Sequence, residues 1–222
     1  MERVWRSHSA SGGAFTSIAD THYGMVVTRF RGKTMLTVRG PETRATPAFG
    51  PADAEFVGIQ FRPGTFIPHL PARMVMDRRD VNLPEASSKS FWLQGSAWHF
   101  PDYENIETFV DWLFQDGLLV HDPVVSAVLR GQVPEVSLRT VQRRFLDATG
   151  LTRGAVCQIE RARYATTLLK QGVGILDVVH QAGYADQPHM TRALRQMTGL
   201  TPAQMMSSDR TPLSFLFKTE PF

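Results

Sequence analysis

The chain has very little cysteine and no long apolar segment. Cys157 is the only cysteine among 222 residues, so the sequence excludes an internal disulfide framework and a zinc site built from several thiolates. No apolar run reaches the roughly 18 residues that a transmembrane helix needs, and the first residues lack the apolar stretch of a signal peptide. We therefore expect a cytoplasmic protein without a membrane partner.

The sequence also lacks the common catalytic and metal-binding motifs. It contains no G-x-S-x-G, G-x-x-x-x-G-K-[ST], G-x-G-x-x-G or H-E-x-x-H. The carboxylates between residues 102 and 116 line the polar side of a predicted amphipathic helix, where paired acid–base catalysis is not expected. No two histidines form the H-x-H pair of a cupin metal site. We expect no enzymatic activity, no cofactor and no metal site.

Basic charge is only slightly in excess, and it is unevenly distributed. The chain has 24 Lys and Arg against 21 Asp and Glu, a net charge of +3, which by itself does not indicate a nucleic-acid partner. Residues 1–120 have a net charge of −1, whereas residues 121–222 carry 12 basic and 8 acidic side chains, a net charge of +4. Any anionic partner is therefore expected at the second half.

Strand patterns broken by proline and glycine occupy the first half. Residues 23–30 and 34–40 flank a short turn that contains Gly32, which predicts a hairpin. A further strand is predicted at residues 55–64. Three prolines predict a loop at residues 41–55, and residues 1–20 are expected to be loosely packed. We predict a small partial β-barrel, cupin-like but degenerate, at residues 1–100.

After Pro101 the spacing of apolar residues becomes helical. Residues 104–116 predict an amphipathic helix that Gly117 ends. We expect this helix, in a connecting segment at residues 101–120, either to dimerise or to dock onto the helical half. An all-α domain follows at residues 121–207 and a tail at 208–222, so the predicted fold class is α+β.

The helical half contains two units of a short helix, a turn and an amphipathic helix. In the first unit, a short turn with an internal proline leads to a helix that Ser137 caps and Gly150 ends. In the second unit, Asp186 caps the corresponding helix and Gly199 ends it. The second helix repeats the first 49 residues downstream, and a long helix between them is expected to act as a rigid linker. This arrangement is typical of paired helix-turn-helix units.

Each amphipathic helix has an apolar stripe and an opposite polar face. The stripes are Leu138, Val141, Phe145 and Ala148 in the first helix and Met190, Leu194 and Met197 in the second. In the major groove, arginine can bind guanine and glutamine can bind adenine. Two such helices can enter successive segments of the groove on one face of a duplex. The residues predicted to contact DNA are Ser137, Arg139, Gln142, Arg143, Gln187, His189, Thr191, Arg192 and Arg195.

The segment from about residue 121 to 206 resembles the AraC-type transcription regulators. The resemblance lies in SLRTVQRRFLDATGLT, in the R-A-x-x-A-x-x-L-L pattern from Arg161 to Leu169, and in GYADQPHMTRALRQMTGLTPAQM. It implies two helix-turn-helix subdomains on a linker helix. It also implies base-facing roles for Arg139, Gln142 and Arg143 in the first subdomain, and for Gln187, His189 and Arg192 in the second.

The β half is similar to the degenerate amino-terminal sensing domains of some short members, through FVGIQFRPGTF and FWLQGSAWHFPD. Such domains are cupin-like in larger relatives and bind an effector or mediate dimerisation. Five aromatic residues near the end of this half could line an effector pocket or could form the core of the domain. They are Phe91, Trp92, Trp98, Phe100 and Tyr103.

We therefore predict a sequence-specific DNA-binding transcription regulator. Its partners would be double-stranded promoter DNA and, as further candidates, a small effector, a second copy of the chain and RNA polymerase. The alternative is a protein-interaction module or anti-regulator that keeps the fold without binding DNA, although such a module has no need for exposed arginines. We expect Cys157 to be a buried structural thiol rather than a redox sensor.

Overall fold

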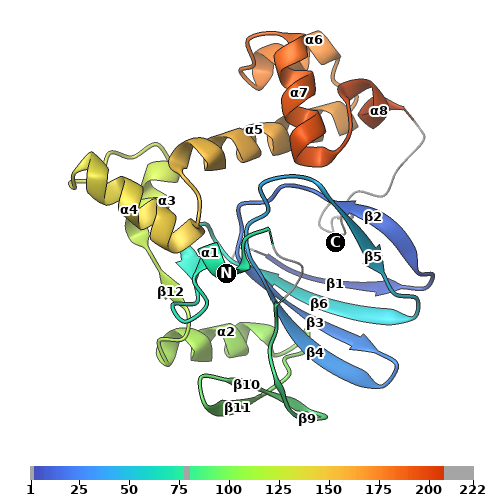
Figure 1. The fold of residues 1–222 in the computed structure, drawn as a ribbon, viewed down its shortest axis with the longest axis vertical. Helices are drawn as coiled ribbons and strands as arrows, with labels where there is room; N and C mark the ends of the chain where they lie inside the picture. The colour runs from blue at the N-terminus through green and yellow to red at the C-terminus, as the bar shows by residue number, and fades with distance from the viewer. Residues whose placement is uncertain (1–2, 78–80, 208–222) are drawn as a thin grey trace. The chain divides into compact units, whose positions relative to one another are not determined.

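The computed structural model describes residues 3–77 and 81–207, and the predicted tail at residues 208–222 lies outside them. The fold is α+β, with antiparallel strands in the first half and helices in the second (Figure 1). The structure divides into two compact units. The first comprises residues 1–12, 22–41 and 51–152, and the second comprises residues 13–21, 42–50 and 153–222. These units do not coincide with the linear ranges 1–100, 101–120 and 121–207 predicted from the sequence.

The main sheet of the first unit has five strands in the order β1-β6-β3-β4-β8. Their bounds are β1 Arg3–Ser9, β6 Ala54–Gln60, β3 Gly24–Phe30, β4 Lys33–Arg39 and β8 Val81–Asn82. The predicted β3–β4 hairpin is confirmed, and its turn residues Arg31 and Gly32 have φ angles of 49° and 74°. Positive φ at both positions gives the turn the twist of the strands it joins.

The expectation that residues 1–20 are loosely packed is wrong. Strand β1 pairs with β6 along its whole length, from Arg3 opposite Gln60 to Ser9 opposite Ala54. Its Trp5 ring lies over Gly58, where a Cβ atom would overlap the ring. A glycine in the middle of β6 therefore lets a large aromatic side chain cover the sheet.

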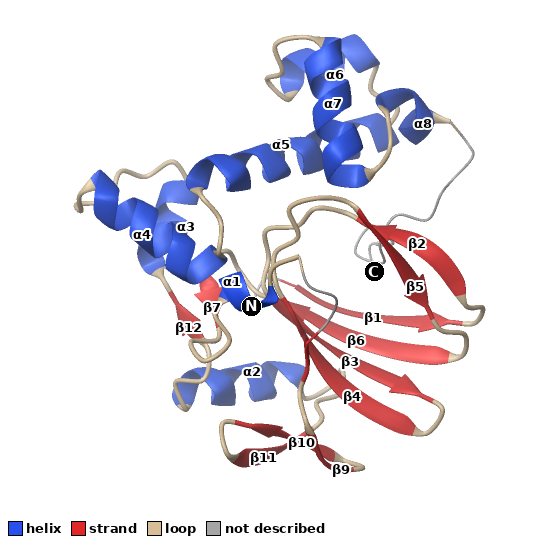
Figure 2. Ribbon diagram, viewed as in Figure 1, coloured by secondary structure: helices blue, strands red, loops and turns tan. Residues whose placement is uncertain are grey.

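Two segments for which the sequence predicted no strand form a separate two-stranded ribbon in the second compact unit (Figure 2). Strand β2 (Gly13–Ser17) pairs with β5 (Thr46–Gly50) in antiparallel register. The prediction of a loop at residues 41–55 is therefore wrong over β5. Pro47 is tolerated because its only paired neighbour is β2, as expected for an edge strand.

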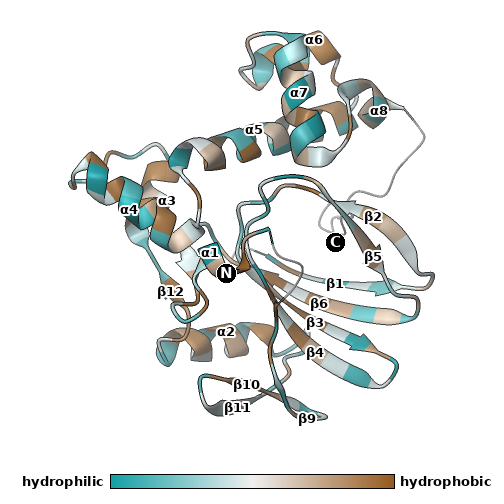
Figure 3. Cartoon of the chain, viewed as in Figure 1, coloured by the Kyte–Doolittle hydropathy of each residue, from teal (hydrophilic) through white to brown (hydrophobic). Residues whose placement is uncertain are grey.

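Helix α2 (Ile106–Gln115) belongs to the core of the first unit. Its buried residues Ile106, Phe109, Val110 and Leu113 join sheet residues such as Met25 and Leu36 in one hydrophobic cluster. The apolar side of α2 is visible in Figure 3. The expectation that this face dimerises or docks onto the helical half is therefore corrected: the sheet already buries it.

Small elements complete the first unit. Strands β9 (Glu85–Ser87), β10 (Ser90–Leu93) and β11 (Ser96–His99) form a three-stranded sheet. Strand β7 (Thr65–Phe66) pairs with β12 (Val120–His121), and helix α1 (Ala72–Val75) follows β7. The helices α3 (Pro123–Leu129) and α4 (Leu138–Thr149) follow β12 and belong to the same unit.

The remaining helices belong to the second unit. They are α5 (Arg153–Lys170), α6 (Ile175–Gln181), α7 (Gln187–Thr198) and α8 (Pro202–Met206). Among the described residues, no helix has the length and apolar character that crossing a membrane would require.

Candidate nucleic-acid interface

Helix α4 begins and ends where the sequence predicts. The Ser137 hydroxyl accepts a hydrogen bond from the Thr140 backbone N–H at 3.2 Å, and Gly150 ends the helix in the left-handed conformation. These contacts satisfy backbone groups that a helix end leaves without partners. The local sequence therefore determines the extent of the helix.

The two faces of α4 are separated as predicted, with one exception. Val141, Phe145 and Ala148 are buried, and Arg139, Gln142 and Arg143 are exposed. Leu138 was predicted in the apolar stripe but is 69% exposed. It is the first residue of the helix.

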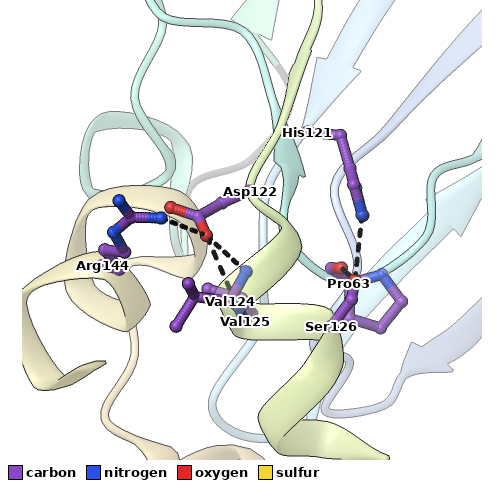
Figure 4. A network of polar contacts seen from close by, with 7 residues as sticks. All are labelled: Pro63, His121, Asp122, Val124, Val125, Ser126 and Arg144. Carbon is purple, nitrogen blue, oxygen red and sulfur yellow. Dashed lines mark hydrogen bonds and ion pairs between the residues drawn. The ribbon is translucent and has the colours of Figure 1, made fainter. Parts of the chain in front are cut away.

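An ion pair joins α4 to the start of α3 (Figure 4). The Asp122 carboxylate accepts the Val124 and Val125 N–H groups at 2.9 and 3.4 Å and so caps α3. The same oxygen lies 3.4 Å from Nη1 of Arg144. Arg144 is therefore held inside the helix-turn-helix unit and is distinct from the outward-facing arginines of α4.

His121 links the start of α3 to strand β7. Its Nδ1 lies 2.9 Å from the Thr65 hydroxyl, and its Nε2 lies 3.0 Å from the Ser126 hydroxyl. The Ser126 hydroxyl donates its proton to the Pro63 carbonyl oxygen at 2.9 Å, so it can only accept from His121. This pattern assigns the neutral Nε2–H tautomer, with Nδ1 accepting from Thr65.

The surroundings of His121 favour that neutral form. Partial burial lowers the pKa of His121, with smaller contributions from Arg62 and Arg130, and the Asp122 carboxylate opposes the shift. Loss of hydration disfavours the charged imidazolium. The junction between β12 and α3 is therefore arranged around an uncharged histidine.

The carboxyl end of α4 packs closely on α1. A Cβ atom on Gly150 would lie 3.1 Å from the Arg73 backbone nitrogen and 3.3 Å from the Ala72 Cβ. Because Gly150 also has a φ of 68°, its lack of a side chain serves both the helix ending and this close approach. The first helix-turn-helix unit is thus fixed on the unit that contains the sheet.

Helix α7 has the same local construction as α4. The Asp186 carboxylate accepts the His189 backbone N–H at 2.6 Å, Pro188 occupies the first turn, and Gly199 ends the helix in the left-handed conformation. Its stripe of Met190, Leu194 and Met197 is buried, as predicted. Gln187, Arg192 and Arg195 are exposed, and His189 and Thr191 are half-buried.

His189 packs within the turn that precedes α7. Its ring meets the Tyr184 ring edge-on, with centroids 5.3 Å apart, and its Nδ1 accepts the Ala185 N–H at 3.5 Å. The guanidinium group of Arg161 lies over the Tyr184 ring, 5.5 Å from its centroid. Burial raises the pKa of Tyr184, and Arg161 partly offsets this effect. These contacts give His189 a structural role beside its predicted DNA contact.

The β2–β5 ribbon supports the carboxyl end of α7. The Ala19 N–H donates to the Met197 carbonyl at 2.7 Å, and the Ala45 N–H donates to the Gln196 carbonyl at 3.0 Å. The last carbonyls of a helix have no partner within it, so these two bonds, donated by residues that flank the β2–β5 ribbon, satisfy part of this end. No sequence pattern predicts these two bonds, because backbone groups are the same in every residue.

Side chains next to the ribbon also bind helix α5. Asp20 Oδ1 lies 2.9 Å from Nη1 of Arg163, and the Thr21 hydroxyl donates to the Glu160 carboxylate at 2.5 Å. Arg163 and Asp20 are only 20% and 13% exposed at their side chains. Residues from the strand-rich half therefore complete the second helix-turn-helix unit.

The repeat of 49 residues is also present in the hydrogen bonds. The Thr149 hydroxyl donates to the Phe145 carbonyl at 2.7 Å and accepts the Leu151 N–H at 3.1 Å. The Thr198 hydroxyl donates to the Leu194 carbonyl at 2.6 Å and accepts the Leu200 N–H at 3.2 Å. By this repeat Arg143 corresponds to Arg192, and both are exposed.

The turn of the first helix-turn-helix unit was expected to be short, but it is longer than the turn of the second. Eight residues separate α3 from α4, and five separate α6 from α7. The first turn is therefore the longer one, because α3 ends at Leu129 and the following segment contains Pro134.

The predicted DNA-contacting residues are grouped on each helix. On α4, Arg139, Gln142 and Arg143 share the exposed face, and on α7, Arg192 and Arg195 do so. The sequence-based set omitted Leu146 and Gln196, which are also exposed. Helical spacing could have placed both on these exposed faces, because Leu146 follows Arg143 by three residues and Gln196 follows Arg192 by four.

Four of the five aromatic residues proposed for an effector pocket pack into one hydrophobic cluster, and Trp92 is the exception. Phe91 is fully buried and packs against Phe100 and Phe109, with ring centroids 5.4 and 6.2 Å away. Trp98 meets the Phe109 ring edge-on at 6.0 Å. Trp92, the next residue after Phe91, is 46% exposed, as expected for neighbours along a strand. The guanidinium of Arg6 lies 4.9 Å from the Tyr103 ring centroid. This packing favours the core interpretation, and the effector pocket stays a prediction.

Cys157 is exposed on α5, so the expectation of a buried thiol is wrong. Within residues 3–77 and 81–207, no group of three His, Cys, Asp or Glu side chains could hold a metal ion.

Comparison with known proteins defines the class of the helical segment. A family profile described as a helix-turn-helix domain matches residues 133–208, which include α4, α5, α6, α7 and α8. The helix-turn-helix domain expected from the sequence is therefore confirmed for this segment.

The helical segment is similar to a named regulator. The chain is 34% identical over 88 residues to the HTH-type transcriptional regulator RipA of Corynebacterium glutamicum. The match covers 39% of this chain and 27% of RipA, so the chain spans about a quarter of that protein.

Two solved structures of ToxT from Vibrio cholerae also align with the chain. They have TM-scores of 0.40 and 0.37, each with 10% identity and 92% of this chain covered. The alignments cover 96% and 98% of the ToxT chains. The second of these ToxT structures is bound to (E)-4-(8-methylnaphthalen-1-yl)but-3-enoic acid.

Proposed function

We propose that the protein is a sequence-specific DNA-binding transcription regulator, with α4 and α7 as recognition helices that enter successive segments of the major groove. The observation that carries this proposal is the pair Arg143 and Arg192. They occupy corresponding positions of a repeat, and both are exposed on helices whose apolar stripes are buried. An interaction module without a DNA ligand gives no reason to repeat an exposed arginine in this way.

The chemistry of each exposed side chain suggests its role. Arg139, Arg143 and Arg192 can each donate two hydrogen bonds to guanine O6 and N7, and Gln142 can pair with adenine N6 and N7. Arg195 can hold a phosphate from the outer face of α7. Gln187 and His189 are proposed to face bases, as the family resemblance implies. Ser137 and Thr191 are suited to the adjacent backbone phosphates, where helix amino termini favour anions.

Substitution of the two repeated arginines tests the proposal. A DNA site selected from random sequences should bind Arg143→Ala and Arg192→Ala about 5- to 150-fold more weakly than the unchanged protein, because each bidentate pair is worth about 1–3 kcal/mol. Lys89→Ala is the matched control, since it removes one exposed positive charge in the β9–β10 turn. Binding by gel retardation should also weaken steeply as salt rises, because phosphate contacts release counterions.

Two results would contradict the assignment. Unchanged affinity in both arginine variants would show that α4 and α7 do not present the DNA-contacting faces. Absence of any DNA retardation at low salt would favour the alternative, a protein-interaction module or anti-regulator.

Effector control is a further part of the proposal, and it concerns the unit that contains the sheet. It is supported by the resemblance of this half to sensing domains. Thermal unfolding in the presence of a metabolite library tests it, and uniformly unchanged melting temperatures would count against it. Dimerisation and a contact with RNA polymerase stay predictions without an assigned surface.

A further inference from the structure

Leu146 is an apolar side chain on an otherwise polar face. It is 47% exposed and follows Gln142 by four residues and Arg143 by three. Residues at these spacings lie side by side on one face of a helix. Leu146 therefore lies beside the two side chains that we assign to base contacts, one turn further along α4.

The equivalent position of the internal repeat carries a charged residue instead of a leucine. The residue 49 positions downstream is Arg195, which is exposed on α7. Both helices have the same threonine hydrogen bonds and the same left-handed glycine at their ends, so the two positions are equivalent. One helix therefore presents an exposed apolar group where the other presents an exposed positive charge.

The edges of the bases in the major groove offer one apolar group, the 5-methyl group of thymine. A leucine side chain has no donor or acceptor for the polar edges, but it can bury that methyl group. We propose that Leu146 is a specificity-determining residue that selects thymine in the DNA site of α4 by contacting its 5-methyl group. This inference rests on the proposed function, because it requires α4 to lie in the major groove.

The proposal also implies a direction for the DNA site. The segment bound by α4 contains a thymine at the Leu146 position, whereas the phosphate contact proposed for Arg195 selects no base at the corresponding position of α7. The two helices therefore differ in what they require of the DNA, which gives the site a direction.

Replacement of thymine by deoxyuridine tests the contact, because it removes only the methyl group. Each thymine of a selected site is replaced in turn, and affinity is measured for the full chain and for Leu146→Ala. One replacement should weaken the unchanged protein about threefold to tenfold, the effect expected for one buried methyl group. Leu146→Ala should bind the thymine site more weakly by a similar factor and should be insensitive to that replacement.

Leu176→Ala is the matched control. Leu176 is 66% exposed but lies on α6, so its replacement should leave both the affinity and the sensitivity to deoxyuridine unchanged. Circular dichroism of both variants checks the fold, which loss of an exposed side chain should preserve.

The outcomes separate this inference from the proposed function. If the protein binds DNA but no thymine replacement matters, or if Leu146→Ala keeps the full sensitivity, the thymine contact is refuted and the regulator proposal stands. If the full chain binds no DNA at low salt, the proposed function fails and the thymine contact fails with it.

Discussion

The two helix-turn-helix units share a local construction but are supported in different ways. In the first, α4 packs on α1, and α3 is joined to β7 through side chains around His121. In the second, residues that flank the β2–β5 ribbon donate backbone hydrogen bonds to the end of α7, and Asp20 pairs with Arg163 of α5. The first copy of the repeat is therefore stabilised mainly through side chains, and the second copy partly through backbone groups.

This difference shows what a short recognition helix requires. Helices of about 12 residues are marginal in water, so burial of one face must supply most of their stability. Caps define the ends of α4 and α7, but neither helix buries its stripe alone. In this chain, elements from the strand-rich half provide part of that support in both units.

Truncation of the two central core side chains gives the largest expected effect on this comparison. Phe145→Ala should destabilise the first helix-turn-helix unit by about 3–5 kcal/mol, because Phe145 is fully buried. Leu194→Ala should destabilise the second helix-turn-helix unit by about 2–5 kcal/mol for the same reason. Hydrogen exchange of the full chain should show faster exchange in α3 and α4 for the first variant, and in α5 to α8 and the ribbon for the second. Equal acceleration everywhere in both variants would mean that the chain unfolds as a single cooperative unit.

Removal of one charge in each unit should have a smaller effect that sharpens the comparison. Asp20→Asn breaks a short, mostly buried pair with Arg163 and should cost about 1–3 kcal/mol. Asp122→Asn breaks a longer pair, at 3.4 Å with Arg144 39% exposed, and asparagine still caps α3. It should therefore cost less than about 1 kcal/mol. Urea unfolding measures both losses, and a larger loss for Asp122→Asn would reverse the ranking.

The pH dependence of the stability of the first helix-turn-helix unit is the smallest expected effect. Because the folded state lowers the pKa of His121, the unfolded chain takes up this proton first as the pH falls below its ordinary value of about 6.5. The stability from neutral His121 is complete above that pH and is lost as the pH falls through the lower pKa of the folded state. Comparing unfolding at pH 7.5 and 5.5 for the unchanged protein and His121→Gln measures this contribution. Identical pH dependence in the two proteins would show that His121 does not contribute to the pH dependence of stability.

Much of the local structure could be predicted from individual residues. Ser137 and Asp186 cap the helices at which they were placed, and Gly150 and Gly199 end them. The β3–β4 hairpin follows from its turn. These features depend on groups within a few residues of one another, so the sequence pattern contains the whole interaction.

Features that depend on distant partners could not be predicted in the same way. Strand β5 contains proline and was expected to be a loop, but it is a strand because β2 pairs with it. The apolar face of α2 was correctly identified, but its partner was not, because an apolar stripe fits any apolar surface of suitable shape. Leu138 and Cys157 were expected to be buried and are exposed, since burial depends on what lies opposite a residue.

The amino-acid order alone determined where the recognition helices begin and end, which faces carry arginine, and that the motif occurs twice. Capping, turn geometry and helical period act over a few residues, so they can be derived from the chain as written. Only the tertiary structure decided that residues 13–21 and 42–50 complete the second unit and that α3 and α4 belong with the sheet. Those pairings involve backbone groups and apolar surfaces that many segments could offer, and the complete fold selects among them.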